Sequence, residues 1–333
     1  MQPLPPDLAA ALCRVGLLGP AEEARGEPLA GGVSSDIWRV ALPRGPVCVK
    51  RALPKLRVAA DWRAPVERNL YEARWMRSAI AAVPSATPAL IGQDETSGTL
   101  VMAYLEPADH PVWKQELHAG RADPAFAAEV GARLGRIHAA TAATPALAAD
   151  FPTDAIFHAI RLEPYLLATA RVHPDVAPAL EHLAAVTAAT KRALVHGDVS
   201  PKNILAGPSG PVFLDAECAW WGDPAFDAAF CLNHLLLKCL WTPSARARFL
   251  ACFDALAAAW IARADWEAPA ELESRAARLL PGLMLARVDG KSPVEYITAE
   301  RDRDTVRRVA KRLLLHPVPR LQDVRASWAK EIG

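Results

Sequence analysis

The chain has 333 residues, of which 52% are hydrophobic and 23% are charged, and its formal net charge is +1. This length allows two lobes with a site between them, and the near-neutral charge argues against nucleic acid or an anionic membrane surface as the main partner. Six scattered cysteines without a Cys-x-x-Cys pair favour reduced thiols over disulfides or zinc. No basic segment leads into an apolar stretch at the N-terminus, and no apolar run is long enough for a bilayer. We therefore expect a cytoplasmic protein that is not bound to a membrane.

The first hundred residues predict several strands and two helices. Residues 7–17 predict a short amphipathic helix, and residues 46–50 (PVCVK) and 98–105 (GTLVMAYL) predict strands, because they alternate or are rich in β-branched side chains. Residues 65–82 predict a second helix, which a proline opens. Beyond residue 107 the pattern is helical except for one short stretch. An α+β fold is therefore expected.

A glycine turn lies between two predicted strands at residues 31–35 (GGVSS). In one interpretation it is an ordinary hairpin turn. In the other, its backbone N–H groups and the hydroxyl of Ser34 or Ser35 approach the phosphates of a nucleotide, which bulkier side chains would prevent.

Lys50 ends the strand at residues 46–50. A charged side chain in a half-buried sheet needs a partner, and phosphate oxygens together with a helix carboxylate would provide one. Glu72, in the middle of the following helix, is the expected carboxylate, and Glu67 is the second choice. The alternative is a lysine at a strand end that extends its ammonium group into solvent.

One stretch carries most of the chemistry. Residues 196–203 read HGDVSPKN, and residues 213–217 read FLDAE at the end of an apolar strand. Phosphoryl transfer from a metal-bound nucleotide needs positioned phosphates, Mg²⁺ and a carboxylate against the attacking hydroxyl. Asp198 is the expected carboxylate, and Asn203 and Asp215 would supply hard oxygen ligands to the metal. Asp, Asn and Gly are also ordinary turn formers, which is the alternative for any one of them alone.

The order of these features resembles the aminoglycoside phosphotransferase and choline kinase-like family, which has the protein-kinase-like fold. The matching segments are GGVSS at 31–35, Lys50, Glu72, the hinge at 102–105, LGRIH at 134–138, HGDVSPKN at 196–203 and LDAECAWWGDPAFD at 214–227. Protein kinases proper match less well, because they have Arg and Lys where this chain has Gly197 and Ser200. The acidic pair in residues 215–217 also resembles methylthioribose kinases.

The resemblance implies a bilobal α+β fold. Residues 1–104 would form a nucleotide-binding lobe with a small antiparallel sheet, and residues 105–333 a larger, mainly helical lobe with the catalytic and acceptor sites. Asp198 would be the base or the group that orients the hydroxyl, and Lys50 would hold the α- and β-phosphates of ATP, oriented by Glu72. The other implied site residues are Ser34 and Ser35 for the phosphates, Met102, Ala103, Tyr104 and Leu105 for adenine, and Asn203, Asp215 and Glu217 for Mg²⁺.

Some residues in these motifs have alternative or purely structural interpretations. Glu217 is either a second metal ligand or a simple hydrogen-bond acceptor. His138 and His196 are interpreted as packed histidines, and Asp227 as an acceptor for N–H groups of the catalytic loop. Residues 287–293 (RVDGKSP) either contact an acceptor hydroxyl or anion or form an exposed turn with a surface ion pair.

The predicted function is ATP- and Mg²⁺-dependent transfer of the γ-phosphoryl group to a hydroxyl of a small-molecule acceptor, such as a sugar or an amino alcohol. One alternative is an aminoglycoside antibiotic phosphotransferase. Residues 244–333 contain 16 Lys and Arg against 12 Asp and Glu, which argues against a polycationic acceptor. The other alternative is a nucleotide-binding pseudokinase with a regulatory role, and the presence of every polar residue that the chemistry requires argues against it.

Overall fold

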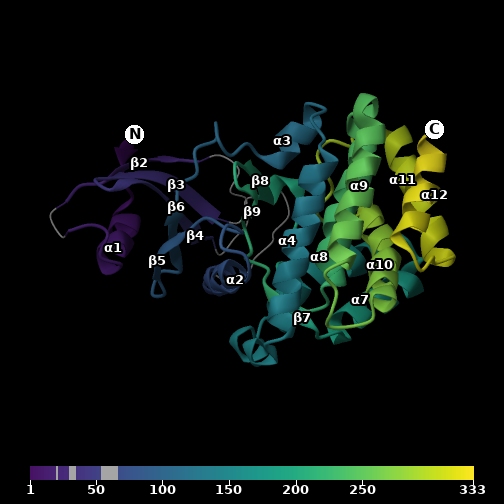
Figure 1. Cartoon of the computed structure of the whole chain (residues 1–333), viewed down its shortest axis with the longest axis horizontal. Coiled ribbons are helices and arrows are strands. Elements are labelled where there is room, and N and C mark those ends of the chain that lie inside the picture. Colours follow the sequence, from purple (N-terminus) through teal and green to yellow (C-terminus); the bar gives the residue numbers. More distant parts are fainter. Residues whose placement is uncertain (20–21, 30–34, 54–66) are drawn as a thin grey trace.

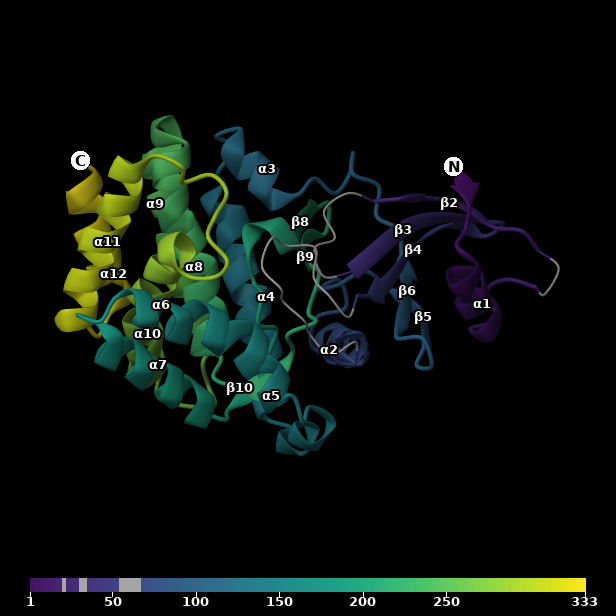
Figure 2. The ribbon, with the colours of Figure 1, turned by 180° about the vertical axis from the view of Figure 1, so that it is seen from behind.

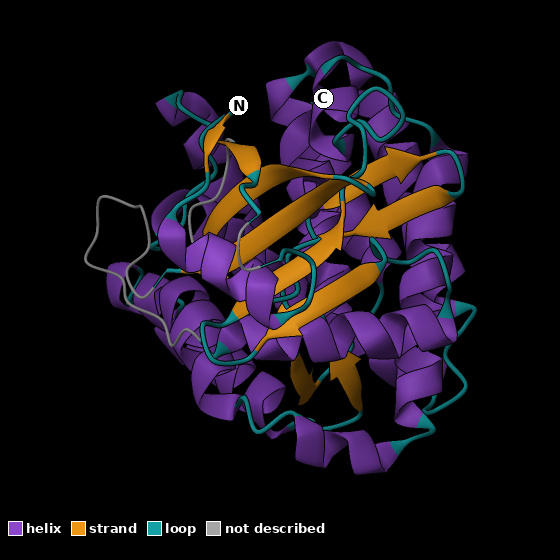
Figure 3. Ribbon diagram, turned by 90° about the vertical axis from the view of Figure 1, so that its left-hand side faces the viewer, coloured by secondary structure: helices purple, strands orange, loops and turns teal. Residues whose placement is uncertain are grey.

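An antiparallel sheet is built from the N-terminal part of the chain. The structure, a computed structural model, describes residues 1–19, 22–29, 35–53 and 67–333. Within these ranges the larger sheet has six strands in the order β1-β2-β3-β4-β6-β5 (Figure 3). They are β1 (Gln2–Pro3), β2 (Arg25–Pro28), β3 (Ser35–Leu42), β4 (Gly45–Ala52), β5 (Leu90–Asp94) and β6 (Thr99–Ala103). The strands predicted at 46–50 and 98–105 are confirmed, although β6 ends two residues before Leu105.

Alternation along the strands separates the two faces of the sheet. Val101 of β6 packs in one hydrophobic cluster with α1 (Pro6–Arg14), whereas its neighbour Leu100 packs in another with α2 (Arg68–Ala82). Lys50 of β4 lies opposite Leu100 in the strand register. Because paired residues share a face, the Lys50 side chain emerges on the face that α2 covers.

The ends of the first helix follow from local chemistry. α1 begins with a proline in its first turn, which lacks only an N–H that would be unpaired there. It ends because Gly16 adopts a left-handed backbone with φ of +72°. The N–H of Gly16 then binds the carbonyl of Cys13, and that of Leu17 binds the carbonyl of Leu12, as in a Schellman motif. For the second predicted helix, the proline start lies outside the described residues, and α2 begins at Arg68.

Helices dominate the rest of the chain, on the opposite side of the molecule from the sheet (Figures 1 and 2). They are α3 (Trp113–His118), α4 (Pro124–Ala142), η1 (Pro145–Asp150), α5 (Asp154–Phe157), η2 (His158–Leu167), α6 (Ala168–Val172), α7 (Ala177–Ala189), η3 (Pro201–Asn203), α8 (Ala225–Trp241), η4 (Pro243–Ala245), α9 (Arg246–Ile261), α10 (Pro269–Asp289), α11 (Glu300–Leu315) and α12 (Leu321–Ile332). η2 has the wider turns of a π-helix and contains Pro164.

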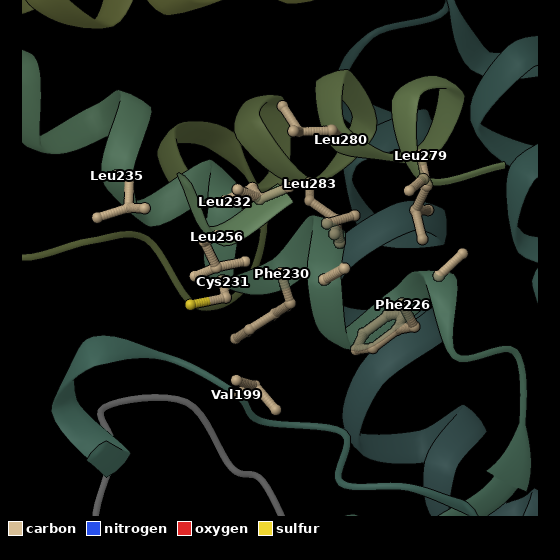
Figure 4. Packing of buried hydrophobic residues seen from close by; sticks show 14 of the residues in the cluster. Val199, Phe226, Phe230, Cys231, Leu232, Leu235, Leu256, Leu279, Leu280 and Leu283 are labelled. Atoms are coloured by element: carbon tan, nitrogen blue, oxygen red, sulfur yellow. The ribbon is translucent and has the colours of Figure 1, made fainter. Parts of the chain in front are cut away.

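α8 is the central helix of this part. Residues 225–239 are all buried, and α8 packs against both α9 and α10. Figure 4 shows Leu232 of α8 close to Leu256 of α9 and Leu283 of α10. In the same view Phe230 points from α8 toward Val199 of the catalytic segment. The segment that carries the chemistry therefore packs against the main hydrophobic core.

Two small two-stranded sheets hold the catalytic segment. β7 (Ala193–Val195) pairs antiparallel with β10 (Trp220–Gly222), and β8 (Ile204–Gly207) pairs antiparallel with β9 (Gly210–Phe213). The residues that join these strands carry the two motifs. The apolar strand expected before Asp215 is β9, so that prediction is confirmed.

The cysteines are free thiols, as expected. Cys218, Cys231, Cys239 and Cys252 are buried, and Cys13 and Cys48 are half-buried. Among the helices in the described ranges, none has the length and apolar character that crossing a bilayer requires.

Candidate active site

Lys50 connects the sheet to the catalytic segment. Its Nζ lies 2.6 Å from Oε2 of Glu72 in α2, and it also pairs with Oδ1 of Asp215. Lys50 and Glu72 are 4% and 2% exposed. The expected carboxylate partner is therefore in place, whereas the second choice, Glu67, precedes α2 in a turn.

The charges in this cluster control one another's protonation. Burial by itself lowers the pKa of Lys50, but the carboxylates of Asp215 and Glu72 outweigh it and raise that pKa. Burial by itself raises the pKa of Asp215, but Lys50 and Lys202 outweigh it and the net shift is downward. Burial raises the pKa of Glu72 to about 7 against the attraction of Lys50. Lys50 and Asp215 therefore stay charged at neutral pH.

Asp198 lies in the catalytic loop and is 5% exposed. Its Oδ2 accepts a hydrogen bond of 2.9 Å from Nδ2 of Asn203. The same oxygen lies 3.1 Å from Nη2 of Arg161 and 3.3 Å from Nζ of Lys202. Three donors converge on one carboxylate oxygen, so its orientation is fixed while the other oxygen remains available to an incoming hydroxyl.

Asp227, in the first turn of α8, fixes the backbone of this loop. Its two oxygens accept the backbone N–H groups of His196 and Gly197, each at 2.8 Å. The fully buried His138 lies 3.2 Å from Oδ2 of Asp227 through its Nε2. Nε1 of Trp260 donates to the other ring nitrogen of His138, so the ring proton resides on Nε2 and is donated to Asp227. The structural interpretation of Asp227 and His138 is confirmed.

His196 links the two motifs. Its Nδ1 accepts the backbone N–H of Asp198 at 3.1 Å, so the ring proton resides on Nε2, which lies 3.1 Å from the carbonyl of Leu214. Burial lowers the pKa of His196, which keeps this neutral tautomer. The ring also packs edge-on against Trp75 of α2, with centroids 4.7 Å apart. His196 is therefore structural, and it ties α2 to the catalytic loop.

A side chain does not fit at Gly197. Its φ is +79°, and an added Cβ would lie 2.7 Å from both Cβ and the carbonyl oxygen of Cys218. Gly197→Ala is expected to lower the free energy of unfolding by about 2–5 kcal/mol, because strain and overlap combine. The matched control is Gly16→Ala, where φ is +72° but nothing lies within 4 Å, and about 1–2 kcal/mol should be lost. Urea unfolding of both variants measures the difference. Equal losses would show that contact with Cys218 has no effect.

Asp215 and Asn203 are held side by side by the backbone. The N–H of Leu214 donates to the carbonyl of Asn203 at 2.9 Å. Asp215 then turns sharply: it is the one non-glycine residue with a positive φ, +67°, in the described ranges. Such strain persists at sites where the surroundings fix the conformation. Asp198, Asn203 and Asp215 are therefore brought to one place, as the spacing predicts.

The carboxylate of Glu217 is hydrogen-bonded to an arginine. Its Oε2 accepts a hydrogen bond of 2.8 Å from Nε of Arg68, and Arg68 also donates to the carbonyl of Leu53 at 2.8 Å. This contact agrees with the second interpretation, a hydrogen-bond acceptor, and whether Glu217 also binds a metal stays a prediction. In the described part of the chain no three or more His, Cys, Asp or Glu side chains form a metal-binding group. A divalent cation here would take only a few ligands from the protein, as Mg²⁺ usually does beside phosphates.

The hinge residues border the same region. A small cavity beside the two residues that pair with Lys50 is lined by Glu72, Trp75, Met76, Pro88, Met102, Phe213, Leu214, Asp215 and Ala216. Met102, at the end of β6, therefore shares a cavity with the Glu72 and Asp215 carboxylates. Ala103, Tyr104 and Leu105 follow it and are half-buried.

The glycine turn is only partly described. Ser35 begins β3 and is 1% exposed, and its hydroxyl has no hydrogen-bond partner within the described residues. Buried hydroxyls are normally paired, so the Ser35 hydroxyl is free to form a hydrogen bond with a ligand atom. Residues 31–34, including Ser34, lie outside the described residues.

Arg161 and Ser200 belong to the site but were not predicted. Arg161 comes from η2 and reaches both the carboxylate of Asp198 and the carbonyl of Gly197. No motif surrounds it, and only an arginine inside an apolar helical segment could have drawn attention to it. Ser200 lies in the catalytic motif itself, and its buried hydroxyl has no partner among the described residues.

Known proteins resemble this chain in sequence and in structure. The sequence profile of the phosphotransferase enzyme family matches residues 25–272. The chain belongs to that family. Its similarity to methylthioribose kinase of Cronobacter sakazakii is 27% identity over 222 residues, 58% of this chain and 54% of that protein. With methylthioribose kinase 1 of Oryza sativa subsp. japonica the chain shares 24% identity over 229 residues, which are 60% of this chain and 53% of that protein. The chain thus spans about half the length of these curated relatives.

Solved structures share the fold of this phosphotransferase family member. A choline/ethanolamine kinase family protein from Mesorhizobium loti superposes with a TM-score of 0.52 at 16% identity, over 97% of this chain and 98% of the other. An amicoumacin kinase in complex with AMP-PNP, Ca²⁺ and Ami gives 0.53 at 14% identity, over 95% and 94%. The predicted α+β, protein-kinase-like bilobal fold is confirmed.

Proposed function

We propose that this chain transfers the γ-phosphoryl group of ATP to a hydroxyl of a small molecule, with Mg²⁺ as the metal. The observation that carries the proposal is the contact of Lys50 with both Glu72 and Asp215, beside a loop in which Asn203 orients Asp198. Membership of the phosphotransferase enzyme family supports it. So does the fold shared with an amicoumacin kinase that was solved with AMP-PNP.

In this proposal the two lobes have different roles. Residues 1–104 bind the nucleotide: Lys50 holds the α- and β-phosphates, and residues 102–105 receive the adenine. Ser34 and Ser35 approach the phosphates. Residues 105–333 supply catalysis and the acceptor site. The expected location is the cytoplasm, a reducing compartment in which the six thiols remain free.

Asp198 acts on the acceptor. Its carboxylate orients the hydroxyl and receives its proton as the acceptor oxygen bonds to the γ-phosphorus. The bond from that phosphorus to the β,γ-bridging oxygen breaks, and ADP leaves with the electron pair. Arg161 and Asn203 keep the carboxylate aimed throughout. The proton passes from Asp198 to solvent as product leaves.

The donor set suits Mg²⁺. The amide nitrogen of Asn203 is engaged by Asp198, so its amide oxygen remains for a cation, next to the ionised carboxylate of Asp215. Both are hard oxygen ligands, and Glu217 is the third candidate. Mg²⁺ bound there would neutralise phosphate charge.

Asp215→Asn is expected to weaken the binding of AMP-PNP in the presence of Mg²⁺ by at least about 10-fold, because one charged metal ligand is lost. Calorimetric titration with and without Mg²⁺ measures this. Asp265→Asn, an exposed aspartate between α9 and α10, is the control. Glu217→Gln in the same titration decides between its two interpretations: a loss like that of Asp215→Asn assigns it to the metal, and unchanged binding assigns it to Arg68. Unchanged Mg²⁺ dependence in Asp215→Asn would contradict the metal assignment.

The function itself is tested by following ADP formation from Mg–ATP with panels of sugars, amino alcohols, aminoglycosides and hydroxy acids. We expect a phosphomonoester from one class, and slow ATP hydrolysis without any acceptor. Preference for aminoglycosides would establish the antibiotic alternative. Nucleotide binding without hydrolysis or transfer would contradict the kinase proposal and support the regulatory alternative.

A further inference from the structure

A lysine is buried in α8, and no carboxylate within the described residues forms an ion pair with it. Lys238 is 1% exposed. Its ammonium lies over the rings of Trp241 and Tyr296, 4.5 Å and 4.4 Å from their centroids. Within the described residues no hydrogen bond or ion pair joins it to another side chain. Burial of an unpaired ammonium group is strongly unfavourable, so this placement needs an explanation.

A second cation lies close by with only neutral acceptors. Arg287, in the last turn of α10, is 8% exposed. Its Nη1 donates to the hydroxyl of Tyr165 at 3.1 Å, and to the hydroxyl of Ser292 at 3.0 Å and its carbonyl. Nε of Arg287 is buried without a partner in the described part of the chain. Of the two interpretations of residues 287–293, an exposed turn is therefore wrong for Arg287.

The carboxylate whose charge acts on Lys238, that of Glu295, is already engaged. Glu295 pairs with Lys114 of α3, and Lys114 itself lies 5.9 Å from the ring centroid of Trp241. The charges of Arg287, Lys238 and Lys114 all act on the buried His234 and, after burial, lower its pKa. Cations therefore outnumber carboxylates around the C-terminal half of α8.

This cationic cluster, defined as Lys238 and Arg287 with the flanking rings of Trp241 and Tyr296, adjoins the catalytic loop. Arg161, which binds Asp198, lies over the ring of Tyr165, and the Tyr165 hydroxyl accepts from Arg287. On α8, residues 230, 234 and 238 share one face, because they are four residues apart. Phe230 on that face points toward Val199, the neighbour of Asp198 (Figure 4). The charge of Lys202, 3.3 Å from Asp198, also reaches His234.

A structural role is the simpler alternative for both cations, since each lies in the last turn of its helix. The helix dipole favours a cation there, but its effect is small and concerns mostly exposed ends. It does not account for an ammonium and a guanidinium that are both buried and that, in the described part of the chain, both lack an ion pair with a carboxylate. An anionic ligand would supply the missing counter-charge to both.

We propose, on the basis of the phosphotransferase function above, that the acceptor is an alcohol that also carries an oxyanion, a carboxylate or a phosphate ester, and that Lys238 and Arg287 bind this oxyanion while the hydroxyl faces Asp198. The transfer is balanced as before: the hydroxyl oxygen bonds to the γ-phosphorus, its proton goes to Asp198, and ADP leaves. The oxyanion itself takes no part in bond making. Polycationic and choline-like acceptors are disfavoured by repulsion.

The protonation state of Lys238 makes oxyanion binding dependent on pH. Burial, together with the charges of Lys114 and Arg287 and against that of Glu295, lowers its pKa to about 7. Tyr296 and His234 face it as well, and both stay neutral because burial shifts their pKa values away from 7. A bound oxyanion favours the charged ammonium. Affinity for the oxyanion should therefore fall as the pH rises above about 7.

Lys238→Met separates this role from a structural one. Removal of a buried charge that lacks a partner should raise Tm by roughly 2–4 °C, whereas loss of a structural contact would lower it. The unfolded chain keeps the usual lysine pKa of 10.5, so the burial penalty is full below pH 7 and shrinks as the pH rises toward 10.5. The rise in Tm should accordingly be larger at pH 6 than at pH 9.

The test of the proposal measures Tm of wild type, Lys238→Met, Arg287→Gln and the exposed control Lys330→Met, with and without Mg–AMP-PNP. The probes are inorganic phosphate, D-glycerate, D-gluconate and ribose 5-phosphate, against glycerol, glucose, ribose and choline at equal ionic strength. At least one oxyanion compound should raise Tm of wild type and Lys330→Met by roughly 2–4 °C, and the neutral and cationic compounds should not. Both site variants should lose the effect. The arms with carboxylates and phosphates show which oxyanion is preferred.

Three outcomes would overturn the proposal: no response of wild type to any oxyanion compound, an equal response to neutral or cationic compounds, or an undiminished response in Lys238→Met and Arg287→Gln. ATP hydrolysis and Mg–AMP-PNP binding, measured on the same preparations, test the phosphotransferase function separately. If they are present and the selectivity for oxyanions is absent, only the assignment of the acceptor fails. If they are absent, the phosphotransferase function fails.

Discussion

Asp198→Asn is expected to slow phosphoryl transfer by about 10²–10⁴-fold, while Mg–AMP-PNP binding stays close to wild type. The amide has the size of the carboxylate and can still accept hydrogen bonds from Asn203 and Arg161. It cannot receive the proton of the acceptor hydroxyl. Turnover should therefore fall far more than affinity for the nucleotide, which contacts other residues.

Steady-state kinetics with the acceptor found in the screen, or slow ATP hydrolysis, measures this loss. Asp265→Asn makes the same chemical change at an exposed position and should leave the rate unchanged. A rate for Asp198→Asn within a factor of roughly three of wild type, far less than general-base catalysis contributes, would remove Asp198 from its catalytic role. Loss of nucleotide binding together with turnover would instead point to a displaced loop.

Asp227→Asn is expected to lower the free energy of unfolding by about 2–4 kcal/mol. Asp227 is fully buried, and its two oxygens accept from the backbone of His196 and Gly197. Asparagine has only one carbonyl oxygen, so its NH₂ group must face a backbone N–H or the ring N–H of His138. At least one buried donor then loses its acceptor, which is more costly than the loss of an exposed hydrogen bond.

Urea denaturation of Asp227→Asn beside Asp265→Asn measures this effect, and turnover should fall as well because the catalytic loop is no longer held. A change below about 0.5 kcal/mol, the size typical of surface substitutions, would show that the loop is fixed by other contacts. A stable variant with reduced turnover would show that Asp227 positions Asp198 without supporting the fold.

The part of the site that depends on local sequence could be predicted. Alternation along residues 46–50 places Lys50 on one face of the sheet, and the helix that follows can offer Glu72 to that face. The spacing of Asp198, Asn203 and Asp215 between short strands brings them together for the same reason. These relations need only strand and helix periodicity and a turn.

Contacts between distant segments could not be predicted in this way. Arg161 reaches Asp198 from a π-helical segment, and Arg68 reaches Glu217 from the first turn of α2. Both pairings depend on how helices pack, which periodicity does not specify. The buried Lys238 is of the same kind: the apolar run around it indicates a core helix, but not that its ammonium would lie between two rings without a carboxylate.

The most direct test of the phosphotransferase function follows ATP by ³¹P NMR with purified wild type and Asp198→Asn, with and without Mg²⁺. We predict that the γ-phosphate signal of ATP declines with wild type only when Mg²⁺ is present, slowly to inorganic phosphate without an acceptor and faster to a phosphomonoester with one. Asp198→Asn should show neither. An unchanged γ-phosphate signal with wild type under every condition, or equal rates in the two proteins, would contradict the assignment.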